Sequence, residues 1–387
     1  MGLIIQKLLS RPLLSLFLLY CLFSIYLFNI YGVKLVNDSE RYLEYAKNLQ
    51  DGFYFDAHNF WYFTYSLFIY FLHFVNSNIL FIVISQYAIG LLAVFSLYKT
   101  YMLLFNDNIG AFLTGLTYIL FAELTTWNSY ILCESLFCSL TCISLYLLTR
   151  LHKQHYSPLS ICITFFTLSL TVLTKPTGIA LLGALCILFI YKNWNNSPSL
   201  VFKIFFSSIL IFCILLLVNQ MLTTFLLVEN YITGDIVYAA STIKNMHNIH
   251  WIVLTPPKNL YIPTNDHQPI IRLILFITHN FVFWIQLFLL KITYFISHIR
   301  PYWSWKHNLF SSIFLYPFYY FAIKFLTNTN VNKELRIFAL SYIFLHTTII
   351  GVTSVDWDGR FLMPLLPIFF LLGTHSFLQL LNSRNNY

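Results

Sequence analysis

Carboxylates are scarce in this sequence of 387 residues, and their distribution along it is uneven. Five of the 14 Asp and Glu residues lie between Asp38 and Asp56, directly after the first hydrophobic stretch. Only 9% of all residues are charged, whereas 58% are hydrophobic. Acidic side chains at a membrane boundary are costly unless they are solvated or used in function. We therefore expect chemistry first in this acidic segment.

Asp38 is the first acid of the segment and the first candidate for a catalytic residue. Its carboxylate could accept a proton from an attacking hydroxyl group, and the low dielectric constant of a neighbouring membrane would raise its basicity. A structural role is also open, because Asn37 or Asp38 would fit the N-cap of a helix that begins at Ser39. The sequence does not decide between a base and a cap.

Glu134 and Lys175 are two further candidates, and each lies beside an apolar run. Glu134 is a lone acid where a hydrophobic segment begins, which points either to function or to a carboxylate that the helix dipole favours. Lys175 begins the sequence Lys-Pro-Thr-Gly, which breaks the apolar run 159–191. On the outer side of a membrane this lysine could bind a phosphate group. It could equally extend its ammonium group to the interface without any ligand.

Arg360 belongs to a second acidic segment, residues 356–360, which precedes the last hydrophobic span. Two acids and an arginine at the entrance of a helix could position a sugar or a diphosphate. Counting spans along the chain, however, places this segment on the inner side, opposite residues 38–56. Either a late span is miscounted or Arg360 takes no part in the same site.

The composition excludes several classes of protein. A mean hydropathy of +0.71, with 40 Phe and 27 Tyr, excludes an ordinary soluble globular protein. The formal net charge is +8, but Lys and Arg stand singly or in pairs beside apolar runs, as the positive-inside rule predicts. No nucleic-acid partner is therefore expected. The sequence also contains neither a metal-binding HExxH motif nor a glycine-rich phosphate loop.

Repeated apolar runs predict the fold. They are about 18 to 22 residues long, which is enough to cross about 30 Å of hydrocarbon. Because backbone polar groups at that depth must pair internally, the runs are expected to be helices. We predict an all-α, polytopic transmembrane bundle of about 11 spans, in a single domain over residues 1–387. The expected spans are 13–33, 79–101, 110–127, 131–149, 159–174, 177–191, 200–220, 272–297, 308–326, 335–351 and 362–381.

Two large outer loops are predicted, a first loop over residues 36–77 and a long loop over residues 225–270. In the first loop, residues 39–49 are expected to form a short helix on the membrane surface, because aromatic and small side chains share one face. Residues 60–75 are apolar but short, and the positive-inside rule is satisfied only if they enter the membrane without crossing it. The long loop could gate substrate access or be a plain connector.

The order of these features resembles the C-type glycosyltransferases, which are integral-membrane enzymes that use sugars linked to polyprenyl phosphate. The likeness is greatest to their protein-mannosyltransferase and aminoarabinose-transferase branch. It extends over most of the chain, and its specificity lies in the succession of short pieces. The pieces are NDSERYLEYAKNL (37–49), NSYILCESL (128–136), LTKPTG (173–178) and GRFLMPLLP (359–367).

The resemblance implies a role for each candidate residue. Asp38 occupies the position of the usual catalytic base and Glu134 that of a second acid at the outer mouth, while Lys175 and Arg360 would bind the donor phosphate. The expected supporting residues are Asn37, Arg41, Tyr42 and His58. A divalent cation, Mg²⁺ or Mn²⁺, is left open as a cofactor, because this chain has Asn-Asp where many relatives have two acids.

The expected function is transfer of a sugar from a polyprenyl-phosphate carrier to an acceptor hydroxyl on the outer face, with inversion at the anomeric carbon. Its partners would be the lipid-linked sugar, membrane lipids and a glycan, lipid or protein acceptor. The expected location is a bacterial inner membrane, with the endoplasmic reticulum membrane as the alternative. Two rival functions are a flippase or transporter of lipid-linked sugars, which would need charges at mid-span, and a polysaccharide polymerase.

Overall fold

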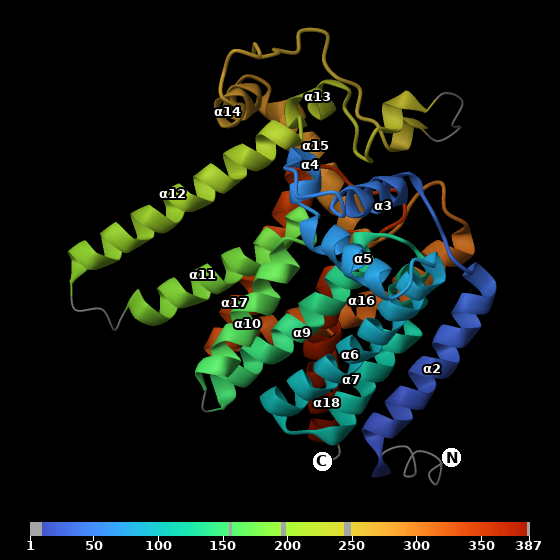
Figure 1. Cartoon of the computed structure of the whole chain (residues 1–387). Helices are drawn as coiled ribbons and strands as arrows, with labels where there is room; N and C mark the ends of the chain where they lie inside the picture. The colour runs from blue at the N-terminus through green and yellow to red at the C-terminus, as the bar shows by residue number, and fades with distance from the viewer. Residues whose placement is uncertain (1–9, 155–156, 195–198, 244–248, 385–387) are drawn as a thin grey trace. The chain divides into compact units, whose positions relative to one another are not determined.

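The computed structural model of the chain describes residues 10–154, 157–194, 199–243 and 249–384 (Figure 1). All regular elements in these ranges are helices, which confirms the predicted all-α class. Among the described residues, seven helices are long and apolar enough to cross a membrane, and there are up to nine spans if each of two bent helix pairs is one span. A multi-span membrane architecture agrees with this finding, whereas the expected count of about 11 spans is not confirmed.

The chain divides into two compact units, and helix α16 contributes to both. Unit 1 contains residues 1–179, 314–331 and 363–387, and unit 2 contains residues 180–313 and 332–362. The helices of unit 1 are α2 (Pro12–Tyr31), α3 (Asn37–Asn48), α4 (Ala57–Phe60), α5 (Phe63–Val75), α6 (Ile79–Phe105), α7 (Asn108–Leu120), α8 (Ala122–Thr126), η1 (Trp127–Ser129), α9 (Cys133–Lys153), α10 (Pro158–Val172), η2 (Pro176–Gly178), η5 (Met363–Leu365) and α18 (Leu366–Arg384). Those of unit 2 are α11 (Ile179–Trp194), α12 (Leu200–Thr224), α13 (Leu227–Ile232), η3 (Ala240–Thr242), η4 (Ile249–Trp251), α14 (Pro269–His279), α15 (Phe281–Ser297) and α17 (Lys333–Val352), with α16 running from Trp305 to Thr327.

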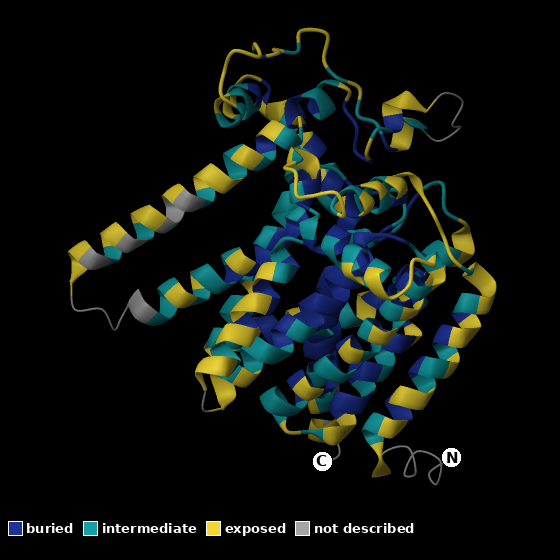
Figure 2. Cartoon of the chain, in the orientation of Figure 1, coloured by how far each residue is buried: buried dark blue, intermediate teal, exposed yellow. Residues whose placement is uncertain are grey.

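Helix α9 forms the core of unit 1. All of its residues from Cys133 to Cys142 are buried, as the dark blue of Figure 2 shows. Serine, threonine and cysteine occupy many of these positions, and small side chains allow neighbouring helix backbones to approach closely. The hydroxyl groups of Ser144 on α9 and Thr171 on α10 are hydrogen-bonded at 2.9 Å. This polar but tightly packed helix has the candidate residue Glu134 in its first turn.

The segment 32–78, which connects α2 to α6, starts and finishes on the same side of unit 1. The Lys34 N–H donates to the carbonyl of Ser129 at 2.9 Å, and the side chain of Gln86 on α6 donates to the carbonyls of the two residues that flank Ser129, each at 2.8 Å. Helix α2 therefore ends where α6 begins, at what we call the loop-1 end. Helix α5, which lies between them, therefore does not cross unit 1. This agrees with the prediction that residues 60–75 enter the membrane without crossing it.

Charge is distributed unequally between the two ends of unit 1. The loop-1 end carries the acids of residues 38–56, whereas the opposite end carries Arg11, Arg150 and Lys153 at the termini of α2 and α9 (Figure 1). Basic residues flanking spans are enriched on the inner side of a membrane. The asymmetry therefore predicts that the loop-1 end faces outward.

Cysteine labelling tests this arrangement. Glu40 and Ser77 are both exposed, on either side of the segment that contains α5. Glu40→Cys and Ser77→Cys should both react with a membrane-impermeant maleimide added outside, and Gln154→Cys, which follows α9, should react only after permeabilisation. If Glu40→Cys and Ser77→Cys were labelled from opposite sides, α5 would cross the membrane and the described topology would be contradicted.

The chain enters α18 at the loop-1 end. Phe370, in the first turns of α18, packs against Phe121 at the end of α7, with ring centroids 6.2 Å apart. His375, further along α18, contacts Tyr101 near the opposite end of α6. The side on which residues 356–360 lie stays a prediction, because they belong to unit 2 whereas α18 belongs to unit 1.

The sequence predicted residues 272–297 as one span. In unit 2 they belong to two helices, α14 and α15, bent by 104°. Buried Asn280 holds the bend, since its amide donates to the Tyr261 carbonyl at 2.8 Å and accepts from the Tyr261 N–H at 2.9 Å. Helix α15 follows α17 only as far as His346, on which Phe295 stacks, before the chain turns back to the loop after α17. The bent pair is therefore either one broken span or a re-entrant loop.

The long loop between α12 and α14 is ordered in its described part. The Asp235 carboxylate accepts hydrogen bonds from the N–H and the hydroxyl of Ser241 at 2.8 and 3.0 Å. The Trp357 indole donates to the Tyr238 carbonyl at 2.8 Å, and the Tyr238 N–H donates to the Val355 carbonyl at 2.8 Å. These bonds favour a folded part of unit 2 over a plain connector.

Candidate active site at the loop-1 end

Helix α3 has the amphipathic pattern that the sequence predicted. Tyr42, Tyr45 and Ala46 are buried, whereas Glu44 and Lys47 on the other face are exposed. A short helix of this kind packs through one face and keeps its charges in water. It therefore fixes the first turn of α3 against unit 1.

Asp38 lies in the first turn of α3 and does not cap it. The helix begins at exposed Asn37, and the hydroxyl that accepts the Val36 N–H, at 3.0 Å, belongs to Ser39. Neither Asn37 nor Asp38 is therefore the N-cap of this helix, which was the alternative to a catalytic role. The Asp38 side chain is 44% exposed, so its carboxylate is accessible to a substrate.

Arg41 lies between Asp38 and two tyrosine rings. Its Nη2 is 3.8 Å from Asp38 Oδ1, and its Cζ is 4.7 Å from the ring centroids of both Tyr42 and Tyr62, in cation–π geometry. Burial acts to lower the pKa of Arg41, but Tyr42, Tyr62 and Asp38 outweigh it and raise the pKa. Its buried Nη1 has no hydrogen-bond partner within the described chain. A charged donor is therefore held beside the exposed carboxylate.

His58 lies on α4, next to the same aromatic group. Asp56 caps this short helix by accepting the Asn59 N–H at 2.6 Å. The imidazole stacks on Tyr62 with ring centroids 5.7 Å apart and an interplanar angle of 16°. Burial against its neighbours lowers the pKa of His58, and the Arg41 guanidinium lowers it further, against the raising effect of Asp56 and Asp38. The ring is therefore mainly neutral at pH 7.

This lowered pKa gives a prediction for stability. The unfolded chain binds a proton at His58 more readily than the folded chain, so protonation destabilises the fold as pH falls below the ordinary value of 6.5. We expect the thermal unfolding temperature of His58→Gln to fall less than that of the wild type between pH 7.5 and pH 5. Equal pH dependence in the two proteins would contradict a lowered pKa.

Glu134 and Lys175 form a buried ion pair. Lys175 Nζ is 2.7 Å from Glu134 Oε1, and each residue is only 3% exposed. Glu134 is in the first turn of α9, and Lys175 follows the end of α10, where the Thr64 N–H donates to the Leu173 carbonyl at 3.1 Å. Two charges removed from water must be well paired to be tolerated. The pair therefore fixes the break after α10 against the start of α9 and α5.

Tyr42 and Cys133 connect the ion pair to α3. The Tyr42 hydroxyl donates to Cys133 Sγ at 3.6 Å, and the Cys133 thiol donates to Glu134 Oε2 at 3.5 Å. Burial raises the pKa of the Tyr62 hydroxyl, and Cys133, Glu134 and Asp38 raise it further, while Arg41 lowers it. Both acids therefore act electrostatically on one hydroxyl group. We call this group the loop-1 site; its members are Asp38, Arg41, Tyr42, His58, Tyr62, Cys133, Glu134 and Lys175.

The loop-1 site contains most of the residues selected from the sequence. Asn37 borders it as an exposed neighbour of Asp38. Arg360 belongs to unit 2, where its Nε is 3.5 Å from Asp358 Oδ1. Sequence reasoning missed two members, Tyr62 and Cys133. Cys133 could have been found from its place beside Glu134, but no sequence signal set Tyr62 apart from its aromatic neighbours.

The described part of the loop-1 site has no group of three closely spaced metal ligands. Mg²⁺ and related ions prefer several oxygen ligands. Across the described ranges, no set of three His, Cys, Asp or Glu side chains with closely spaced ligand atoms includes Asp38 or Glu134. One of these carboxylates is paired with lysine and the other with arginine. A divalent cation held by one carboxylate and the donor phosphate stays a prediction.

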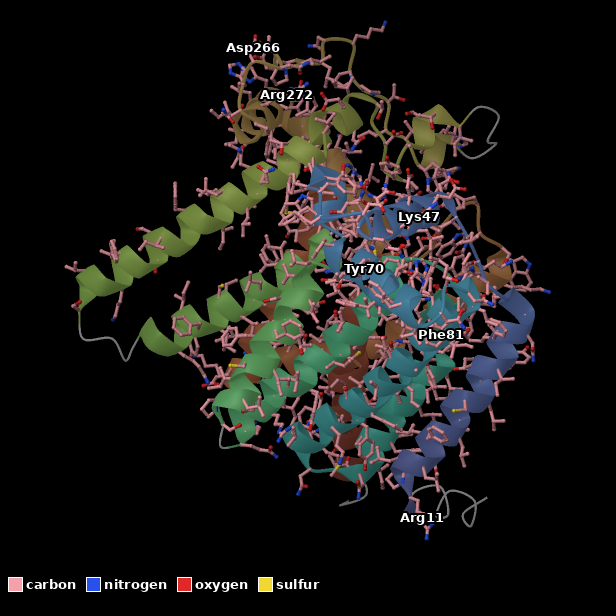
Figure 3. The ribbon with its side chains drawn as sticks, viewed as in Figure 1. Arg11, Lys47, Tyr70, Phe81, Asp266 and Arg272 are labelled. Carbon is pink, nitrogen blue, oxygen red and sulfur yellow. The ribbon has the colours of Figure 1, made fainter. Side chains whose placement is uncertain are left out.

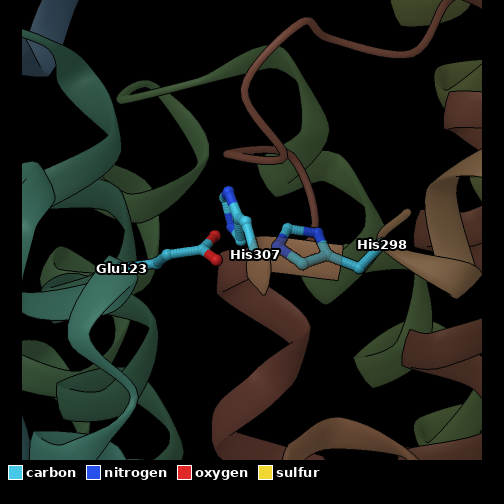
Figure 4. Close-up of side chains that lie close together, drawn as sticks. All are labelled: Glu123, His298 and His307. Atoms are coloured by element: carbon cyan, nitrogen blue, oxygen red, sulfur yellow. The ribbon is translucent and has the colours of Figure 1, made fainter. Parts of the chain in front are cut away.

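Two histidines of unit 2 are close to each other, as Figure 4 shows. His298 follows α15 and His307 lies in the first turn of α16, and their nearest ligand nitrogens are within 4.8 Å. Trp303 contacts both, edge-on to His298 at 5.2 Å and stacked on His307 at 4.3 Å between centroids. Glu123, also drawn, is on α8 of unit 1. The histidines belong to an aromatic cluster that supports the segment between α15 and α16.

Comparison of the chain with protein-family models, with curated proteins and with solved structures finds no match. The residues of the loop-1 site themselves define the chemistry that is available there. An accessible carboxylate can remove a proton from a hydroxyl group, and an adjacent guanidinium can stabilise a developing phosphate charge. The loop-1 site holds these two groups on adjacent turns of one helix, over a buried ion pair.

Proposed function

We propose that this protein is a membrane glycosyltransferase that moves a sugar from a polyprenyl-phosphate carrier to an acceptor hydroxyl at the loop-1 end. The observation that supports the proposal is the meeting of three separate segments there. Accessible Asp38 adjoins Arg41 on α3, while Tyr42 and Cys133 connect α3 to the buried Glu134–Lys175 pair. Such a site at the end of membrane-length helices suits a substrate with a polar reacting group and a lipid tail.

The proposed reaction requires no activation beyond the leaving phosphate. Asp38 takes the proton of the acceptor hydroxyl, and the acceptor oxygen forms a bond to the anomeric carbon. The bond between that carbon and the phosphate oxygen breaks, and its electron pair leaves with the polyprenyl phosphate. Arg41 stabilises the negative charge that develops on this phosphate. Attack opposite the leaving group inverts the anomeric carbon.

The geometry favours a positioning role for the ion pair. Lys175 was predicted to contact the donor phosphate, but its ammonium group is buried and bound to Glu134. We assign the pair to holding Cys133 and Tyr42 beneath Arg41. Arg41 has a side chain that is 25% exposed and is the better placed cation for the phosphate. A contribution of Arg360 to donor binding stays a prediction.

A flippase is the main rival, and the placement of the acids speaks against it. Transporters of charged groups usually carry ionisable residues near the middle of their spans. In the described part of unit 1, Asp38 and Glu134 lie in the first turns of α3 and α9, and the remaining acids of residues 38–56 lie in or beside α3 and α4. Acids at one boundary suit a reaction at that boundary.

Bound lipid identifies the donor class. The wild type and Asp38→Asn should be purified in mild detergent, and their lipids extracted and identified by mass spectrometry. Because Asp38→Asn should bind the donor without consuming it, we expect it to retain polyprenyl-phosphate sugar, whereas the wild type retains polyprenyl phosphate. Arg41→Gln is the control for lipid that copurifies non-specifically. If neither the wild type nor Asp38→Asn retained more polyprenyl lipid than this control, the proposal would be contradicted.

A further inference from the structure

Unit 2 contains a cavity of about 310 Å³ where α12 ends, between α13 and the start of α14. Its lining is divided into an apolar wall and a polar side. Leu222, Leu226 and Leu273 belong to the apolar wall, and Glu229, His267 and Arg272 belong to the polar side. The cavity is therefore amphipathic and uses residues of unit 2 alone.

The position of the cavity along α12 places it at a membrane boundary. This helix has 25 residues, and at about 1.5 Å per residue it is longer than the hydrocarbon core of a bilayer. Its described side chains are mostly exposed, and Figure 2 shows this exposure along its length; Leu215, Leu216 and Leu217 are examples. Leu222 and Leu226 extend this apolar surface into the cavity, so an acyl chain lying on α12 would lead to it.

The polar side of the cavity contains a partly satisfied ion pair. Arg272, labelled in Figure 3, donates from Nη1 to Glu229 Oε1 at 2.6 Å and from Nε to the Pro263 carbonyl at 3.3 Å. The Glu229 side chain is 41% exposed, but its Oε2 is itself covered and accepts no hydrogen bond from any described residue. A covered carboxylate oxygen without a donor is costly, so a ligand that donates to it would be favoured.

We propose that the cavity binds the headgroup of a phospholipid that carries both a phosphate and a primary ammonium group. Arg272 and His267 bind the phosphate, and the ammonium group donates to Glu229 Oε2. The acyl chains lie on Leu222, Leu226 and the exposed face of α12. Only this headgroup satisfies both charges, since an anionic glycerol headgroup brings no cation and a choline headgroup has no N–H to donate.

Lipid binding to the full-length, delipidated protein in detergent tests the proposal. Native mass spectrometry would compare phosphatidylethanolamine, phosphatidylcholine and phosphatidylglycerol with identical chains, together with water-soluble phosphoethanolamine. A lost charged hydrogen bond corresponds to about a tenfold change in affinity. We therefore expect the wild type to prefer phosphatidylethanolamine about tenfold over both other lipids, and Glu229→Gln to lose this preference. Arg272→Gln should bind all three lipids weakly.

Controls separate the cavity from a general effect on unit 2. Lys192→Gln breaks a different ion pair of this unit, 2.7 Å from Lys192 Nζ to Glu334 Oε2, and should keep the preference. Leu226→Trp fills the apolar part of the cavity, keeps both charges and should abolish lipid binding. This variant keeps the proposal testable even if Glu229→Gln does not fold. Equal binding of the three lipids, a preference unchanged in Glu229→Gln or Leu226→Trp, or phosphoethanolamine binding as tightly as the lipid would overturn the proposal.

Discussion

Asp38→Asn should lower the rate of sugar transfer by about 100- to 10,000-fold, the usual contribution of a general base. The amide keeps the shape of the side chain but cannot take a proton. Because Asp38 is 44% exposed and does not cap α3, the thermal unfolding temperature should change little. The initial rate of polyprenyl-phosphate release by purified protein measures the effect.

Glu40→Gln is the matched control for Asp38→Asn. It removes an exposed carboxylate from the same first turn of α3, and so has the same effect on helix charge. Transfer by Glu40→Gln should remain close to that of the wild type. If Asp38→Asn were as active as Glu40→Gln, Asp38 would not be the base.

Lys175→Met should destabilise the fold by about 3 to 5 kcal/mol, because it leaves the Glu134 carboxylate buried without its cation. The double substitution Glu134→Gln/Lys175→Met removes both charges and should recover most of this loss. Chemical unfolding in micelles would give the free energies for the double-mutant cycle. Lys47→Met, at an exposed position of α3, is the control and should stay within about 0.5 kcal/mol of the wild type.

The double-mutant cycle also distinguishes positioning from phosphate binding. If the Glu134–Lys175 pair positions α9 beneath Arg41, the refolded double variant should lose transfer rate more than donor affinity. A double variant that is stable but binds donor far more weakly, with an unchanged maximal rate, would make Lys175 a phosphate ligand. Additive losses in the two single variants would mean that the pair is not coupled in solution.

Hydrophobic periodicity predicted those features of the fold that depend only on which side chains of a single segment are apolar. Tyr42 and Tyr45 are buried on α3 as their spacing indicated, and the short apolar segment 60–75 does not cross unit 1. The bend within residues 272–297 was not predicted. Asn280 is polar but bonded to the distant Tyr261 backbone, and such a partner cannot be read from an apolar run.

The site could be predicted only in part for a similar reason. Asp38, Glu134 and Lys175 stand out because charge is rare in the chain. Their connections depend on tertiary packing, which brings the Cys133 thiol between Tyr42 and Glu134 and places Tyr62 on Arg41. Because the ion pair forms between residues 41 positions apart, the sequence alone suggested a free Lys175 for phosphate.

The fate of the sugar on a lipid carrier tests the central claim most directly. Purified protein in vesicles would receive a panel of radiolabelled polyprenyl-phosphate sugars with candidate acceptors, and both the label and the carrier would be followed. We expect label on an acceptor, an equal amount of released polyprenyl phosphate and an inverted anomeric carbon, all lost in Asp38→Asn. Label that stays on its carrier and only changes leaflet would instead identify a flippase and contradict the transferase account.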